Sequence, residues 1–218
     1  MSRIYVASSW SNKHQQNLVE QLRKRGHKVY DFKHPHGRND IPVFEQVSIT
    51  QNLRSAYKER CLKGEDFKRM LMDRLSVERF KEHYGAMQDA DTCILLLPAG
   101  RSSHTEAGLM NGMGKRVFVM DTSKVIIPEL MYLAFDDYFF DFEKLFKAVD
   151  KPISGVCRVC GCTEDNPCYH PEHGYCYWVD EERTLCSHCA ELCDDPSENI
   201  CNDPLTEHCI NDKTNFFK

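Results

Sequence analysis

The residues whose types and spacing could perform chemistry lie in one stretch, 91–116. An apolar segment, Thr92–Leu97, predicts a buried strand, and a polar turn, Pro98–Thr105, leads from it into a helix of small residues that we expect to start at Glu106. The helix dipole favours a carboxylate at that position, and the free backbone N–H groups of the turn can hold an anion. The stretch therefore predicts a nucleophile and an anion-binding loop side by side.

An ordinary helix start would use the same residues. Ser103 or Thr105 could accept a hydrogen bond from a backbone N–H group of the first turn, and Glu106 would then complete the cap. Since caps of this kind are common, the spacing alone leaves both interpretations open.

A second group of reactive side chains lies near the end of the sequence, where ten of the 12 cysteines stand at or after residue 157. Two CxxC pairs, Cys157 with Cys160 and Cys186 with Cys189, are 25 residues apart. This spacing is typical of a closed zinc site with a folding role and no open position for catalysis. The other cysteines and histidines of the segment could form a second site, or an iron–sulfur cluster: Cys162, Cys168, Cys176, Cys193, His170 and His173. We expect one or two structural zinc ions and no organic cofactor.

The composition limits the classes of protein that the chain can belong to. Its 218 residues are 41% hydrophobic and carry a net charge of -5, which argues against disorder and against extensive nucleic-acid binding. Residues 151–218 hold 5 Lys+Arg against 13 Asp+Glu, whereas the preceding residues hold 23 against 20. We therefore expect the first part to favour an anionic small substrate and the acidic end to repel nucleic acid.

Nothing in the sequence indicates a membrane or export. No apolar run approaches the roughly 20 residues of a membrane span, and the first residues do not have the pattern of a signal peptide. We expect a cytoplasmic protein, and in that compartment a cysteine cluster favours metal over disulfides.

The elements around the central stretch predict an α/β domain. Arg3–Ala7 and His27–Phe32 are expected strands, and Asn12–Arg25 between them has helical spacing with a polar outer face. A helical lid or insertion follows before the central stretch. The remaining expected elements are a long helix over 66–87, a strand over 117–120, a short helix over 128–134, an edge strand over 138–140 and a closing helix over 142–149. We expect five parallel strands with helices on both faces, in a domain of residues 1–150 followed by a linker (151–156), the cysteine-rich zinc module (157–193) and an acidic tail (194–218).

Four segments carry a resemblance to a known family: IYVASSW, GHKVYDFKHP, DADTCILLLPAGRSSHTEAGLMNGMGK and VFVM. Together they resemble the nucleoside 2-deoxyribosyltransferase-like superfamily, which includes the 2'-deoxynucleoside 5'-phosphate N-hydrolases, and within it small phage-type proteins. The resemblance covers most of residues 3–149. It implies a flavodoxin-like, doubly wound fold, N-glycosidic bond chemistry on nucleosides or nucleotides, and a homo-oligomer, because relatives complete their sites across subunits.

The resemblance also implies residue roles. The family's nucleophilic glutamate falls on Glu106, an aspartate that handles the base falls on Asp91, and an aromatic residue of the first strand falls on Tyr5. The phosphate-handling loop falls on Gly100, Arg101, Ser102 and Ser103. The transferases have an aspartate where this chain has Gly100, and the arginine and serines that follow favour a phosphorylated substrate.

Other residues near the expected strand ends could contact the substrate. Trp10 and Phe32 could stack on a base, although buried aromatic side chains are also common in α/β cores. His34 and His36 could contact the base or a metal, or be plain loop residues, and His104 could assist proton transfer. Ser8 and Ser9 complete the expected substrate-binding set.

Two functions from different classes fit these residues. The first is an N-glycosidase, releasing or exchanging the base of a nucleotide or nucleoside through a glycosyl–Glu106 intermediate. The second is a catalytically silent protein that binds or senses a nucleotide in the same site and uses the zinc module to bind a partner. A phage-encoded partner protein without a small ligand is a third.

Overall fold

The computed structural model describes residues 1–35 and 41–193. The chain divides into two compact units, Ser2–Val149 and Asp150–Lys218, the second of which also takes in Met1. The predicted acidic tail, 194–218, lies outside the described residues, and so does His36.

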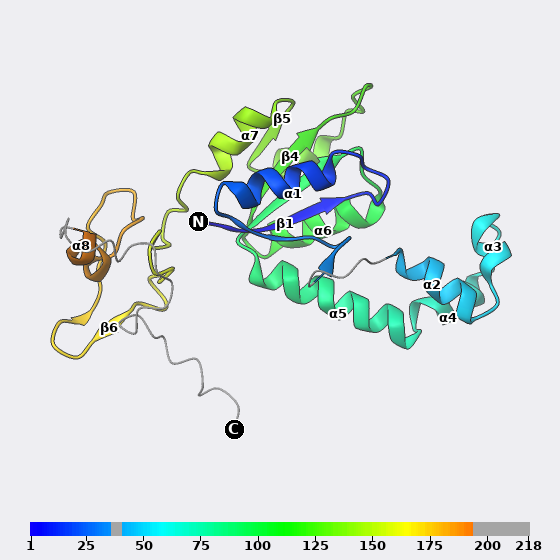
Figure 1. Cartoon of the computed structure of the whole chain (residues 1–218), viewed down its shortest axis with the longest axis horizontal. Coiled ribbons are helices and arrows are strands. Elements are labelled where there is room, and N and C mark those ends of the chain that lie inside the picture. Colours follow the sequence, from blue (N-terminus) through cyan, green and yellow to red (C-terminus); the bar gives the residue numbers. More distant parts are fainter. Residues whose placement is uncertain (36–40, 194–218) are drawn as a thin grey trace. The chain divides into compact units, whose positions relative to one another are not determined.

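The first unit is built on a parallel sheet of five strands in the order β2-β1-β3-β4-β5 (Figure 1). Its strands are β1 (Arg3–Ser8), β2 (Lys28–Tyr30), β3 (Thr92–Leu97), β4 (Arg116–Asp121) and β5 (Asp137–Phe139). The central strand β3 is buried along its whole length, as its unbroken apolar sequence predicts for a strand covered on both faces. This strand order is the flavodoxin-like one, so the predicted fold class is confirmed.

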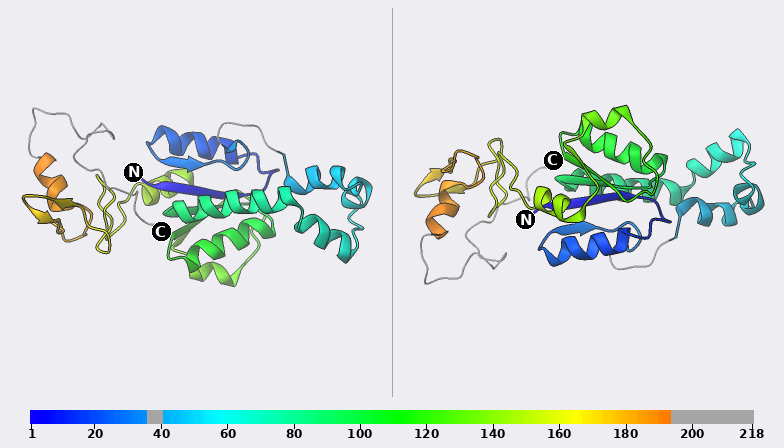
Figure 2. Two further views of the ribbon diagram at one scale, coloured as in Figure 1. Left: turned by 90° about the horizontal axis from the view of Figure 1, so that it is seen from below. Right: turned by 90° about the horizontal axis from the view of Figure 1, so that it is seen from above.

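Helices cover both faces of the sheet, and Figure 2 shows α1 and α5 on opposite sides of β1. The covering helices are α1 (Gln15–Lys24), α5 (Arg74–Asp89), α6 (Arg101–Gly112) and α7 (Phe142–Val149). Successive side chains of a strand point to opposite faces. Ile4 and Val6 of β1 therefore pack in the core with α1 and α7, whereas Tyr5 and Ala7 pack in the core with α5 and α6.

The helical insertion is present, but the single long helix predicted over 66–87 is wrong. The chain forms α4 (Gly64–Leu71) and then α5, which begins after Asp73. The Asp73 side chain accepts a hydrogen bond from the backbone N–H of Leu75, so this aspartate caps a new helix. Together with α2 (Val43–Thr50) and α3 (Arg54–Lys58), α4 lies beyond the carboxyl end of β1 (Figure 1).

The helix after β3 starts five residues earlier than predicted. Gly100 is its extended N-cap residue, and the predicted turn residues 101–105 form its first turn. The hydroxyl of Thr105 donates to the carbonyl of Arg101 at 3.0 Å, a bond made inside a helix and not at its cap. Glu106 is therefore the sixth residue of α6, and the interpretation of Glu106 as a residue at the helix start is wrong.

The later elements of the chain are short. The predicted helix over 128–134 is a 3-10 helix, η2 (Leu130–Ala134). In the second unit, β6 (Tyr169–His170) and β7 (Gly174–Tyr175) form an antiparallel pair, followed by α8 (Ser187–Cys193). Among the described residues of this unit, the buried hydrophobic cluster consists of four cysteines: Cys157, Cys162, Cys186 and Cys189. None of the helices in the described part of the chain has the length and apolar character needed to span a membrane.

Candidate active site

Glu106 faces the sheet from the second turn of α6. Its neighbours on the same helix stripe, Ser103, Ala107 and Met110, are buried, while Glu106 itself keeps a minor exposed fraction. Burial raises the pKa of its carboxyl to about 7, and the nearby Tyr5 hydroxyl opposes this rise. A carboxyl with a pKa near neutrality is poised to exchange its proton at physiological pH.

Tyr5 brings a fully buried phenol to this carboxyl. Burial, and secondly the Glu106 charge, raise the pKa of Tyr5 well above its usual value, so the phenol keeps its proton. Its ring stacks on Tyr30 with centroids 5.5 Å apart, which fixes the position of the hydroxyl. Although this hydroxyl affects the Glu106 pKa, it makes no hydrogen bond of normal geometry within the described residues.

A second buried hydroxyl lies further along the same strand. Ser8 is 7% exposed, and its Oγ atom has no hydrogen-bond partner among the described residues. Buried hydroxyls without a partner are rare in folded proteins, and a catalytic role is one recognised reason for them. Tyr5 and Ser8 thus give β1 two unsatisfied hydroxyls on residues that the sequence assigned to the site.

Asp91 lies apart from this group. It precedes β3, where its carboxylate accepts hydrogen bonds from the backbone N–H of Arg3 and the hydroxyl of Thr92, both at 2.8 Å. The Arg116 guanidinium at the start of β4 is also close enough to interact with its charge. These contacts hold the amino ends of the strands together, whereas ligands of such sheets bind at the carboxyl ends. The described contacts of Asp91 thus lie at the amino ends of the strands, and its role in base handling stays a prediction.

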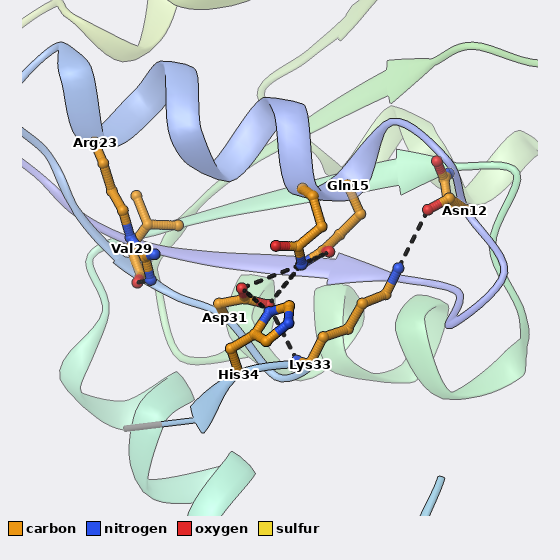
Figure 3. A network of polar contacts seen from close by, with 8 residues as sticks. Asn12, Gln15, Arg23, Val29, Asp31, Lys33 and His34 are labelled. Atoms are coloured by element: carbon orange, nitrogen blue, oxygen red, sulfur yellow. Dashed lines mark hydrogen bonds and ion pairs between the residues drawn. The ribbon is translucent and has the colours of Figure 1, made fainter. Parts of the chain in front are cut away.

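Asp31, a residue that the sequence analysis did not select, connects the start of α1 with the loop after β2 (Figure 3). Asp31 is 3% exposed. Its carboxylate accepts hydrogen bonds from Gln15 at 2.9 Å, from the Lys33 backbone at 3.0 Å and from His34 Nδ1 at 2.9 Å. These donors outweigh burial and hold the pKa of Asp31 below its usual value. A carboxylate close to the carboxyl end of an expected strand, His27–Phe32, was the signal that could have revealed it.

The polar network continues from Lys33 to Asn12 (Figure 3) and from the Asn12 side chain to the third strand. The ammonium of Lys33 donates to the backbone carbonyl of Asn12 at 3.2 Å. The Asn12 side chain then donates to the carbonyls of Leu96 and Pro98 at 3.3 and 3.2 Å. The loops after β1, β2 and β3 are therefore joined at one edge of the sheet.

The predicted aromatic pair is brought together at this edge. Trp10 and Phe32 meet edge to face, with ring centroids 5.1 Å apart. Phe32 is 5% exposed and Trp10 is 36% exposed, so Trp10 offers the accessible ring. Ser9 lies in the same turn, where its hydroxyl is 2.9 Å from that of Ser11.

The predicted phosphate loop is the N-terminal turn of α6. Its first backbone N–H groups lack intrahelical partners and can hold an anion. Arg101 and Ser102 are exposed, whereas Ser103 is 3% exposed. His104 is fixed, because its Nδ1 atom donates to the carbonyl of Gly100 at 2.8 Å and its Nε2 atom is 2.8 Å from the Tyr132 hydroxyl.

The cysteines of the second unit could hold a metal. The sulfur atoms of Cys157, Cys160, Cys186 and Cys189, the two predicted CxxC pairs, all lie within 4.8 Å of one another. A second group of sulfurs with the same spread contains Cys160, Cys162, Cys168 and Cys186. Cys176 lies beside Cys162, whereas His170 and His173 form a separate group with Glu172. The side chain of Cys193 is outside the described part.

The solved structures that resemble this chain include two nucleoside-processing enzymes. A 2-deoxyribosyltransferase from Bacillus psychrosaccharolyticus is 18% identical over 65% of this chain and 88% of its own length, with a TM-score of 0.44. A CMP N-glycosidase from Clostridium botulinum is 15% identical over 68% of this chain and 99% of its own length, with a TM-score of 0.37. Both are of the superfamily that the motifs of residues 3–149 resemble. No family model matches the chain, and no curated protein matches it. Phage origin and bound zinc stay predictions.

Proposed function

We propose that the chain cleaves the N-glycosidic bond of a nucleoside or nucleotide, with Glu106 attacking C1' of the sugar. The observation that carries this proposal is that Glu106, a partly exposed residue, has a carboxyl with a pKa of about 7 that interacts with the buried Tyr5 hydroxyl. A carboxylate that stabilises an oxocarbenium-like carbon by covalent attack is the chemistry of retaining glycosidases.

The proposed mechanism uses the ionised form of Glu106. This carboxylate attacks C1' and forms a glycosyl ester. The C1'–N bond breaks, and its electron pair leaves with the base, which takes up a proton from water. Water then hydrolyses the ester, or a second base replaces the first. A hydrogen bond from Tyr5 would orient the carboxylate and favour its ionised form, because a donor stabilises a negative charge.

Recognition of the substrate would use the adjoining edge of the sheet. The exposed ring of Trp10 can stack on a base. A 5'-phosphate would bind the free N–H groups at the start of α6 together with the Arg101 guanidinium, which supplies paired donors. Ser8 and His34 lie at the ends of the first two strands and would contact the sugar or base.

A panel of nucleoside monophosphates and the matching nucleosides tests this proposal, with free base measured by chromatography. Glu106→Gln should lower base release by on the order of 10³-fold or more, as loss of a nucleophile does. Glu20→Gln, on the exposed side of α1, is the control and should leave the rate unchanged. Undiminished release in Glu106→Ala would contradict the assignment, and labelled free base entering the nucleoside pool would indicate transfer.

A silent nucleotide-binding protein is the second candidate. It is favoured by Gly100, which stands where the transferases have an aspartate and takes up the N-cap position of α6. In that case calorimetry would detect nucleotide binding that survives Glu106→Ala, with no base released by either protein.

We also propose a homo-oligomer in the cytoplasm. The segment before and within η2 exposes six large apolar side chains, each at least half exposed: Val125, Ile126, Ile127, Leu130, Met131 and Leu133. Apolar patches of this kind are typical of subunit interfaces, and a second copy of the chain is the expected occupant. Light scattering should give a mass above that of one chain, and Leu133→Glu should reduce it.

The proposed cytoplasmic location is supported by the cysteines. Those in the described part of the second unit form no disulfide, which fits a reducing compartment.

A further inference from the structure

The two cysteine groups of the second unit are not independent, because they share two members. Each group of four sulfurs fits within 4.8 Å, and Cys160 and Cys186 belong to both. Two separate tetrahedral sites would need eight ligands, whereas these groups contain six different thiols. The two four-sulfur sites therefore share one pair of sulfur atoms, those of Cys160 and Cys186.

The distances between the sulfur atoms agree with metal coordination. Cys160 and Cys186 are 3.8 Å apart, Cys160 and Cys168 are 4.0 Å apart, and Cys168 and Cys186 are 3.7 Å apart. Zinc–sulfur bonds of about 2.3 Å in a tetrahedron separate the sulfurs by about 3.8 Å. A disulfide would bring them to about 2.05 Å. The three sulfurs thus have the spacing of one face of a tetrahedral thiolate site.

The backbone explains how neighbouring cysteines can serve two ions. Gly161, between Cys160 and Cys162, has a φ of +74°, a conformation that favours glycine. Its N–H donates to the carbonyl of Cys157 at 2.9 Å, and the Cys157 N–H donates to the carbonyl of Cys162 at 2.9 Å. This tight turn presents Cys157 to one group and Cys162 to the other, with Cys160 between them.

We propose that this unit binds two divalent metal ions, most suitably zinc, as a cluster with bridging thiolates. One ion is bound by Cys157, Cys160, Cys186 and Cys189, and the other by Cys160, Cys162, Cys168 and Cys186. Binding releases six thiol protons and involves no change of oxidation state. Sharing two ligands leaves a cluster charge of -2, whereas two separate four-thiolate sites would carry -4. Cys176 is 3.6 Å from Cys162 and belongs to neither group.

Metal analysis of the full chain, purified with zinc and then dialysed, tests the stoichiometry. We expect two zinc ions per chain. Cys157→Ser and Cys162→Ser should each lose one ion, since each removes a ligand of one site. Cys160→Ser should lose both, because it removes a bridge. Cys176→Ser is the matched control and should retain two. A single ion in the wild-type chain, iron with acid-labile sulfide, or loss of an ion in Cys176→Ser would overturn the proposal.

A measurement on the unaltered sequence covers the case in which the variants do not fold. After exchange of zinc for ¹¹³Cd, the spectrum should show two cadmium resonances in the range of sulfur coordination. Because a shared thiolate connects the two nuclei, the resonances should be scalar-coupled to each other. Two uncoupled resonances would show separate sites and would overturn the bridging assignment.

Discussion

The two units of this chain are held together by different forces. In Ser2–Val149 a sheet buried on both faces carries the structure, with apolar clusters on each side. In Asp150–Lys218 the described buried core is four cysteines, and such a small unit has little apolar surface to bury on folding. The first unit can therefore keep an incompletely satisfied polar site, because its stability comes from elsewhere, whereas the second depends on its candidate ligands.

Removal of metal by a chelator should give the largest difference in stability between the two units. Metal binding contributes roughly 10–16 kcal/mol to the folding of small zinc modules, so a strong chelator should unfold residues 156–189 and leave residues 3–149 folded. Hydrogen exchange read by mass spectrometry measures both parts in one sample. Equal protection of the second unit with and without chelator would show that its core does not need metal.

Whereas the cysteine ligands should stabilise the second unit, Glu106 should lower the free energy of unfolding of the first unit. Its pKa rises from 4.5 to about 7 on folding, so between these values the folded state holds more protons than the unfolded state. The contribution of Glu106 protonation to the free energy of unfolding is then fully present below about pH 4.5, and it is lost as the pH rises through 7. Glu106→Gln should therefore stabilise this unit by roughly 2–3 kcal/mol at pH 8 and by little at pH 4.5. Urea unfolding at the two pH values measures the difference, with Glu20→Gln as control. A gain of the same size at both pH values would contradict the linkage.

These two cases also show how far the sequence could lead. The five parallel strands follow from apolar segments and short connections, the flavodoxin-like arrangement follows from the resemblance, and the CxxC pairs follow from spacing alone. The start of α6 did not follow, because an extended Gly100 and a first turn of polar residues resemble a loop in sequence. As a result the sequence predicts Glu106 at the start of the helix, and its partial burial against Tyr5 could be recognised only in three dimensions. Asp31 was missed for a similar reason, since its hydrogen-bond donors come from α1 and from the loop that follows Asp31.

Asp31→Asn should test whether the loops at the carboxyl edge act as one unit. The amide keeps one acceptor oxygen, while the carboxylate receives Gln15, His34 and the Lys33 backbone. Loss of charge-assisted bonds of this kind costs roughly 1.5–3 kcal/mol. We expect a several-fold rise in KM with a smaller change in kcat, because the network positions substrate-binding loops and does not touch the reacting carbon. Steady-state kinetics measure this, and Asp89→Asn, an exposed residue at the end of α5, should change neither constant.

Tyr5→Phe should have the smallest effect on folding and an informative one on pH dependence. The buried hydroxyl makes no normal hydrogen bond within the described residues, so its removal should change stability by about 1 kcal/mol or less. The hydroxyl nevertheless lowers the pKa of Glu106, and without it the carboxyl should titrate at higher pH. If the ionised form attacks the sugar, the acidic limb of the kcat/KM profile should shift to higher pH. Activity at pH 7 should then fall several-fold, and it should recover at pH 9. A uniform loss at every pH would instead mean that Tyr5 acts by positioning the substrate. An unchanged profile would mean that the Tyr5 hydroxyl has no effect on the pKa of the Glu106 carboxyl, which would then be raised by burial alone.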